Sequence, residues 1–238
     1  MPDRSLHPRH TGIARGFRPR GTEHTRIELF SDAVFAFALT LLVVSLEVPR
    51  TFHDLMQSMQ GFVAFAVCFA VLMQIWFKHY GYFRRYGLQD MTTRVLNSVL
   101  LFIVLFYVYP LKFLWTHLLG GGGQDFNQAE GRMLLVVYGL GGAAVFLIFV
   151  LLYRHAWRLR DDLDLNPLER YDTRAAIVEN LLTAAVPMLS VLLALVLPEH
   201  LAGLAGWIYL SYGPVLTWNG IRDERGRRPL EAAVEGER

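Results

Sequence analysis

Residues Thr25 to Pro49 read TRIELFSDAVFAFALTLLVVSLEVP, and this stretch decides the class of fold. From Ala33 to Leu46 it is apolar except for Thr40 and Ser45. An apolar run of about 20 residues is long enough to cross a lipid bilayer as a helix. The stretch therefore predicts a transmembrane helix. Its few polar groups are informative, because polar groups inside a bilayer are costly and often mark function or helix contacts.

The helix that this stretch predicts has two different faces. At about 100° per residue, bulky apolar side chains fall on one stripe. The stripe consists of Phe30, Val34, Phe37, Leu41, Val44 and Val48. Thr40 and Glu47 fall on the flank of the stripe, and Asp32 points away from it. Either the stripe is an ordinary packing face with interfacial charges beside it, or it carries the function.

The composition places the whole chain among polytopic membrane proteins. Hydrophobic residues make up 53% of its 238 residues and occur in long blocks. We expect an all-α fold with six transmembrane helices in one domain. The predicted spans are residues 27–47, 60–77, 94–114, 132–153, 173–197 and 201–218. Only Pro198-Glu199-His200 separates the last two, which predicts a tight helical hairpin.

The basic residues predict the orientation of the spans. Lysine and arginine are concentrated in residues 4–26, 78–94, 154–174 and 222–228, and they are sparse in the loops between these ranges. Cytoplasmic loops of membrane proteins carry such an excess of basic residues. Both termini are therefore expected in the cytoplasm.

Three regions follow from this pattern. Residues 1–24 are predicted to be a disordered basic tail, residues 25–219 the six-helix membrane domain, and residues 220–238 a charged, frayed tail. The acidic stretch Asp161–Asp172 is predicted to be a cytoplasmic linker. The six-helix unit is not repeated within the chain.

The sequence offers no constellation typical of an enzyme. Cys68 is the only cysteine, so an intramolecular disulfide is impossible, and the histidines occur on both predicted sides of the membrane at no helical spacing. Metalloprotease, P-loop and nucleophile-elbow motifs are absent. We expect no enzymatic activity, no metal site, no cofactor and no nucleic-acid partner.

The motif Arg26-x-x-x-Phe30-Ser31-Asp32, followed by a small residue and an apolar run with a threonine, resembles the signature of the transmembrane protein 175 family. These proteins are potassium channels of endosomes and lysosomes, with single-repeat relatives in prokaryotes. The resemblance implies a potassium-preferring cation channel in a prokaryotic plasma membrane. Because this chain has one repeat, four copies would be needed for the pore, so we expect a homotetramer in the lipid bilayer with permeating K⁺ in the pore.

The resemblance also implies where the pore narrows. In the family, a ring of isoleucine or leucine side chains on the first helix forms a hydrophobic constriction that serves as gate and filter, with a threonine layer close by. Aligned on the signature, the ring falls on Phe37, with Thr40, Leu41 and Val44 beyond it. Phe37 departs from the aliphatic residue of the family.

The remaining signature residues are expected to act in assembly. By resemblance, Trp76 and His79 would hold Ser31 and Asp32 between helices; the alternative is an interfacial aromatic belt. Arg26 is positioned to compensate the negative charge of Asp32. The family also has a third helix that ends in an aromatic-proline turn, which Asn97 and Tyr109-Pro110 resemble.

Two further acids complete the candidate residues. Glu47 is expected at the outer mouth of the pore, either as a ring of carboxylates or as a lone charge paired with Arg50. Glu179 lies inside the fifth span, where Arg174 is its expected partner. The alternative function is a secondary transporter or accessory membrane protein that uses Asp32 and Glu179 in a polar relay.

Overall fold

The structure is a computed structural model that describes residues 17–21, 25–44, 51–119 and 128–236. Every regular element of this described part is helical. The elements are α1 (Arg26–Val44), α2 (Phe52–Tyr86), α3 (Met91–Leu119), α4 (Gln128–Arg158), α5 (Pro167–Val196), the 3₁₀ helix η1 (Glu199–Ser211) and α6 (Tyr212–Gly236). The prediction of an all-α protein with six helices is confirmed.

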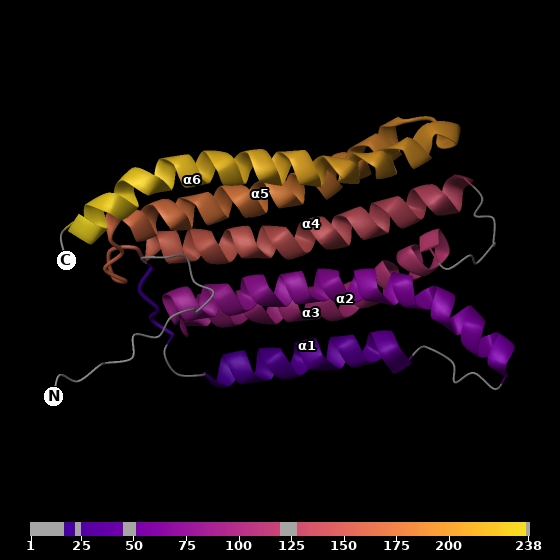
Figure 1. Cartoon of the computed structure of the whole chain (residues 1–238), viewed down its shortest axis with the longest axis horizontal. Coiled ribbons are helices and arrows are strands. Elements are labelled where there is room, and N and C mark those ends of the chain that lie inside the picture. Colours follow the sequence, from indigo (N-terminus) through magenta and orange to yellow (C-terminus); the bar gives the residue numbers. More distant parts are fainter. Residues whose placement is uncertain (1–16, 22–24, 45–50, 120–127, 237–238) are drawn as a thin grey trace.

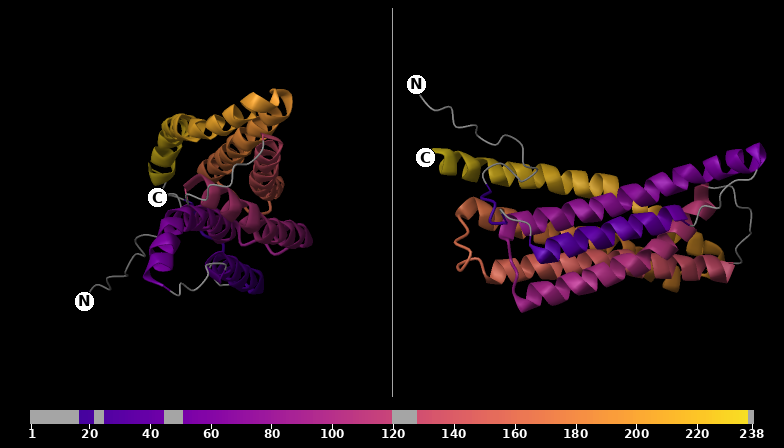
Figure 2. Two further views of the ribbon diagram at one scale, coloured as in Figure 1. Left: turned by 90° about the vertical axis from the view of Figure 1, so that its right-hand side faces the viewer. Right: turned by 90° about the horizontal axis from the view of Figure 1, so that it is seen from below.

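The helices form one elongated bundle with α1 at its edge (Figure 1). α1 packs on α2 and α3, and within the described residues it makes no comparable contact with the later helices. α4 packs on α3 and most extensively on α5, and η1 and α6 lie beyond α5. A view along the bundle shows the same order of helices (Figure 2).

One end of the bundle gathers the start of α1, α3 and α5 and the end of α2, α4 and α6, on the left of Figure 1. We call it the basic end, because the arginine-rich segments 18–20, 84–94 and 154–174 lie there. α1 therefore starts at the same end at which α6 finishes. An even number of membrane crossings requires this arrangement.

Four of the described helices are long and apolar enough to span a bilayer. They cover residues Phe62–Tyr86, Met91–Thr116, Ala129–Arg158 and Pro167–Val196. The helices extend beyond the spans expected from hydropathy. At the end of α2, for example, the side chains of Tyr82, Phe83 and Tyr86 are fully or almost fully buried. Their aromatic packing continues the helix past the purely apolar stretch.

The third helix also differs from the expected pattern. α3 runs through Pro110 to Leu119, so the Tyr109-Pro110 pair does not end it. Neighbouring helices and local adjustments make a proline tolerable inside a membrane helix. The aromatic-proline turn expected from the resemblance is therefore not a helix end in this chain.

The sixth span differs from the prediction. Instead of one α-helix over residues 201–218, the chain forms η1 and then α6, which continues to Gly236. Ala202 and Ala205 are buried three residues apart, which matches the three residues per turn of a 3₁₀ helix. The hydroxyl of Ser190 on α5 donates to the carbonyl oxygen of Ala205 at 2.8 Å and ties η1 to the bundle.

The prediction of a frayed C-terminal tail is also wrong for most of that segment. α6 extends through residues 220–236 because its charges find partners. Arg227 Nε donates to Asp172 Oδ1 on α5 at 2.9 Å, and Arg227 Nη1 donates to Glu231 Oε2 one turn later at 3.0 Å. The last two residues of the predicted tail, 237–238, lie outside the described residues.

Part of the predicted N-terminal tail is packed against the bundle. Residues 17–21 lie against the basic end, where Arg18 and Arg20 bond to the buried carboxylate of Glu169. Phe17 is buried edge-on against Tyr86, with ring centroids 5.7 Å apart. The remaining tail residues, 1–16 and 22–24, lie outside the described residues.

The expected linker Asp161–Asp172 contains the start of α5. Asn166 caps this helix, accepting from the backbone N–H of Glu169 at 2.8 Å, while Glu169 accepts from the N–H of Asn166 at 3.0 Å. Such a reciprocal capping box satisfies two backbone donors that a helix start leaves open. The acidic residue at the third helical position thus starts a helix and also binds the N-terminal segment.

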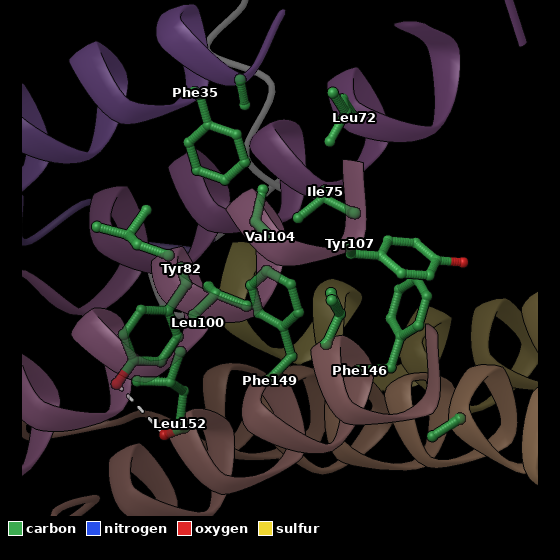
Figure 3. Packing of buried hydrophobic residues seen from close by; sticks show 14 of the residues in the cluster. Phe35, Leu72, Ile75, Tyr82, Leu100, Val104, Tyr107, Phe146, Phe149 and Leu152 are labelled. Carbon is green, nitrogen blue, oxygen red and sulfur yellow. Dashed lines mark hydrogen bonds between the residues drawn. The ribbon is translucent and has the colours of Figure 1, made fainter. Parts of the chain in front are cut away.

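The core joins α1 to the rest of the bundle through aromatic and branched side chains (Figure 3). Phe35 of α1 reaches the layer formed by Val104 of α3 and its neighbours, and Phe149 of α4 lies on the other side of that layer. The Tyr82 hydroxyl donates to the carbonyl oxygen of Leu152 at 3.3 Å. α2 and α3 therefore form the layer through which α1 is held.

Close approach between α4 and α5 depends on a glycine. A Cβ atom at Gly139 would lie 2.5 Å from Val191 Cγ2 and 2.9 Å from the carbonyl oxygen of Pro187. Small residues at such positions let membrane helices pack backbone to backbone. This contact fixes the spacing of the most extensively packed pair of helices.

We predict that Gly139→Val lowers the thermal midpoint of the detergent-purified protein. Overpacking of a close contact costs about 1–3 kcal/mol. The control is Gly131→Val on the same helix, where a Cβ would meet no atom within 4 Å. Equal midpoints for the two variants would contradict a close α4–α5 contact at Gly139.

Candidate functional site

The start of α1 is held by a capping box that sequence reasoning did not identify. The Thr25 hydroxyl donates to Glu28 Oε1 at 2.9 Å and accepts from the backbone N–H of Glu28 at 3.3 Å. The N–H of Thr25 donates to the same carboxylate oxygen at 3.3 Å. The Thr-x-x-Glu spacing is a known signal for a helix start, so it could have been found in the sequence. It explains why Glu28 is buried.

Asp32 faces α2, away from the exposed face of α1. Trp76 Nε1 donates to Asp32 Oδ1 at 2.8 Å. The Trp76 ring in turn stacks on Tyr80, with centroids 5.7 Å apart. A carboxylate at this depth needs a hydrogen-bond donor. The indole ring of tryptophan supplies one N–H donor and is otherwise apolar, so it can be buried in this layer.

Ser31 takes part in a directional chain of hydrogen bonds. Its hydroxyl donates to the carbonyl oxygen of Ile27 at 2.7 Å and accepts from Asn97 Nδ2 at 2.9 Å. Asn97 Oδ1 lies 2.8 Å from His79 Nε2, so that ring nitrogen carries the proton. Ser31, Asn97 and His79 are all buried. The chain thus fastens α1 to α3 and α2 at one level.

The structure brings four of the predicted signature residues together and adds a fifth. Trp76 contacts Asp32 directly, whereas His79 reaches Ser31 only through Asn97. The sequence suggested no role for Asn97 beyond a resemblance, because its bonding depends on the register between α1 and α3. The signal in the sequence that could have indicated a role for Asn97 is the presence of an asparagine within an apolar helix.

Arg26 does not pair with Asp32 as predicted. Arg26 is exposed at the first position of α1, and the hydrogen bond that Asp32 makes in the described part runs to Trp76. A helix places residues six apart on different faces, which separates the two side chains. The prediction that Arg26 pairs with Asp32, about one and a half turns away, is therefore wrong for the single chain.

The far end of α1 is also tied to α3. Lys112 Nζ donates to the carbonyl oxygen of Leu42 at 3.1 Å, in the last turn of α1. Carbonyl groups at a helix end lack intrahelical donors, and a cation there is favourable. α1 is therefore fastened near both of its ends.

The opposite face of α1 is uncovered. Phe30 is 64% exposed and Phe37 is 57% exposed. Thr40, about one turn after Phe37, is also exposed on this face. Val34 and Leu41 are only half-buried and touch the core from the flanks of this face. The side chain of Val44, as well as Glu47 and Arg50, lies outside the described residues. Of the apolar stripe in the sequence, Phe30 and Phe37 thus lie on the surface of the single chain, whereas Val34 and Leu41 border the core.

Thr40 presents an oxygen atom on that surface. Its hydroxyl donates to the carbonyl oxygen of Ala36 one turn earlier, at 2.9 Å. Because the proton points back along the helix, the oxygen lone pairs are available to a donor or a cation outside the helix.

Glu179 has a different partner from the one expected. Lys78 Nζ of α2 bonds to Glu179 Oε1 at 2.6 Å, while the Arg174 guanidinium lies over the Trp157 ring, 4.3 Å from its centroid. Arg174 and Glu179 are five residues apart on α5 and so lie on different faces. Asp32 and Glu179 bond to separate side chains of α2, which leaves the polar relay without a continuous path in the described residues.

No group of three or more histidine, cysteine or acidic side chains that could hold a metal ion occurs in the part of the chain described here. The chemistry of the site is therefore that of a helix with one anchored face and one open face. Among the hydrogen bonds of this site in the described residues, none joins a nucleophile to a base.

We predict that Asp32 and Trp76 are energetically coupled in folding. Asp32→Ala, Trp76→Phe and the double variant form a cycle, and hydrogen bonds to charged groups contribute about 1.5–3 kcal/mol. Thermal or denaturant unfolding in detergent measures the coupling. Trp207→Phe is the control, since Trp207 is 68% exposed. Additive effects of the two substitutions would contradict the bond.

Known proteins resemble the chain along most of its length. The family described as "Endosomal/lysosomal potassium channel TMEM175" matches residues 26–107, from the start of α1 into α3. A potassium channel of Marivirga tractuosa is 42% identical over 237 residues, covering 92% of this chain and 96% of that protein. A potassium channel of Chamaesiphon minutus is 28% identical over 150 residues, covering 59% of this chain and 67% of its own length.

Solved structures agree with this similarity. A crystal structure of a variant of the potassium channel MtTMEM175, bound to a nanobody–MBP fusion, has a TM-score of 0.81 and 41% identity. It covers 90% of this chain and 100% of that one. A lysosomal potassium-selective channel TMEM175 homolog from Chamaesiphon minutus shares the fold, with a TM-score of 0.55 and 24% identity over 83% of this chain and 96% of that one. These relatives are channels and not enzymes, as the sequence predicted. This chain is a multi-pass integral membrane protein and belongs to the TMEM175 family of potassium channels.

Proposed function

We propose that this chain forms a homotetrameric, potassium-preferring cation channel whose pore is lined by α1. The observation that carries the proposal is the contrast between the two faces of α1. One face is fixed to α2 and α3 by the bonds of Asp32 and Ser31, and the other exposes Phe30, Phe37 and Thr40 at the edge of the bundle. A fourfold axis beside that edge would bring four copies of this face together.

Exposure of phenyl rings is not sufficient by itself, because lipid also accepts them. The hydroxyl of Thr40 adds a second argument, since its back-bonded proton leaves an oxygen that can replace hydration water of a cation. The names of the relatives add a third: they are potassium channels, one of them described as potassium-selective. Together these favour an ion pathway over a lipid-facing surface.

Phe37 is the proposed constriction of this pathway. Four phenyl rings around an axis would form a dry segment, and hydrophobic constrictions gate by expelling water. Thr40, Leu41 and Val44 would follow along the pore. We place Glu47 at the mouth beyond them, where a ring of carboxylates would concentrate cations.

The signature residues Arg26, Phe30, Ser31 and Asp32 with Trp76 and His79 act in assembly in this proposal. Asp32 points at Trp76 and not at the axis, so it does not touch ions. Arg26, exposed at the start of α1, is placed to meet a neighbouring subunit. The basic end faces the cytoplasm of a prokaryotic cell, by the excess of arginine there.

Reconstitution tests the channel and its assembly together. We predict that the purified chain has four times the monomer mass in detergent and passes K⁺ faster than Na⁺ down a gradient in liposomes. Light scattering with size exclusion measures the mass, and a flux assay with each cation measures permeation. A dimer or monomer that is fully folded would overturn the tetramer. Flux that requires a second, counter-transported substrate would favour a transporter.

We predict that Phe37→Ala raises the basal K⁺ flux by widening and wetting the constriction, and that it weakens discrimination against Na⁺. Phe37→Asn should also raise flux, since a polar ring wets more easily at similar radius. Thr40→Val should instead reduce selectivity with little change in basal flux, because it removes the hydroxyl and keeps the shape.

Each variant is compared at matched tetramer content in the same liposomes. Phe102→Ala is a suitable control, as Phe102 of α3 is 70% exposed and lies on another helix. If Phe37→Ala conducts no more than the parent, Phe37 is not the constriction and Leu41 becomes the next candidate.

A further inference from the structure

A cavity of about 570 Å³ lies at the side of the bundle, between α2 on one side and α4 and α5 on the other. It is separate from the face of α1 described above, because no α1 residue lines it. Its volume is within the range of sites that hold small organic molecules. Its walls differ in chemistry from the inside to the mouth.

The inner wall contains an unsatisfied acceptor. Asn180 of α5 is only 1% exposed, and its Nδ2 donates to the carbonyl oxygen of Ala176 at 2.7 Å. Its Oδ1 has no hydrogen-bond partner within the described part of the chain. A buried amide oxygen without a partner is costly, so an occupant that offers an O–H or N–H group would be stabilised there.

The wall on α2 supplies two cations. Lys78 and Arg85 lie seven residues apart, on the same face of the helix, with Gly81 between them. Lys78 is bonded to Glu179 at 2.6 Å, whereas Arg85 Nε is buried without a hydrogen-bond partner in the described residues. A Cβ at Gly81 would meet no atom within 4 Å, so the space between the two cations is open.

The rest of the lining is mostly apolar, and Gln74 and Tyr153 are its polar residues. Phe77 is 61% exposed at the mouth, and Ala70 and Met73 continue the same side of α2 toward the middle of the membrane span. The cations and Asn180 lie nearer the basic end. The cavity thus has a charged and polar part toward the basic end and a more apolar part toward the middle of the membrane spans.

We propose that this cavity binds an anionic phospholipid whose headgroup carries hydroxyl groups, of which phosphatidylglycerol is the simplest probe. Its phosphate would lie between Arg85 and Lys78, as basic pockets between membrane helices hold anionic headgroups. A headgroup hydroxyl would donate to Asn180 Oδ1. Glu179 accepts a second hydroxyl and disfavours a headgroup with more than one negative charge. One of the two acyl chains of the lipid lies against Phe77 and Met73.

Lipid binding to the detergent-purified full chain tests the assignment. Phosphatidylglycerol and phosphatidylcholine with the same acyl chains are titrated, and bound lipid is counted by native mass spectrometry beside the thermal midpoint. Inorganic phosphate is the third probe, which separates a lipid from a soluble phosphate. The assay needs no ion flux, so it stands apart from the channel function.

Two variants address the cavity, and the second also removes the guanidinium that lies over the Phe17 ring, 5.4 Å from its centroid. Gly81→Leu fills the open space between the cations, and Arg85→Gln removes one charge. The matched controls are Gly220→Leu on α6, where a Cβ also meets no atom within 4 Å, and Arg154→Gln, an exposed arginine of the basic end. Unchanged midpoints in the absence of lipid show that each variant is folded.

We expect phosphatidylglycerol to bind more tightly than phosphatidylcholine. Arg85→Gln should weaken phosphatidylglycerol binding about fivefold, the effect of one basic residue at a membrane surface, and Gly81→Leu should abolish the preference. The controls should bind like the parent. Equal binding of the two lipids, unaltered binding by Gly81→Leu, or equal stabilisation by inorganic phosphate would each overturn the proposal.

Discussion

The hydrogen bonds that fix the rotation of α1 are the constraint on which the rest of the arrangement depends. Trp76 holds Asp32, and His79 holds Ser31 through Asn97. A helix that is apolar on nearly all sides has little reason to prefer one rotation in lipid, since lipid tails are as apolar as its partners. Polar groups at a single level remove that freedom, because any other rotation leaves buried donors and acceptors unpaired.

Once that rotation is set, the opposite face of α1 is set as well. Phe37 and Thr40 are turned outward because Ser31 and Asp32 are turned inward. The bonds of the signature and the proposed pore surface are thus two consequences of the same helix orientation. In the channel that we propose, the signature residues would therefore act on the ion pathway indirectly, by determining which side chains of α1 line it.

The basic end holds segments distant in sequence together through charge. Glu169 accepts from Arg18 and Arg20, and Asp172 accepts from Arg227, so the segments before α1 and at the end of α6 both meet the first turns of α5. Buried carboxylates are tolerated there because each has a guanidinium partner. Arg85 nearby is a further cation of that region: its guanidinium lies over the Phe17 ring, and its Nε is buried without a hydrogen-bond partner in the described residues.

The sequence by itself determined the helical class, the membrane location and the two faces of α1, because long apolar blocks and a 3.6-residue period depend only on local chain geometry. It did not determine which polar groups meet. Only the resemblance pointed to Trp76 as a partner of Asp32, and the partner of Glu179 and the central place of Asn97 depend on the register between helices, which packing decides. The continuation of α6 and the docking of residues 17–21 were likewise settled by charges on other helices, since a polar segment becomes ordered only where the tertiary structure offers it partners.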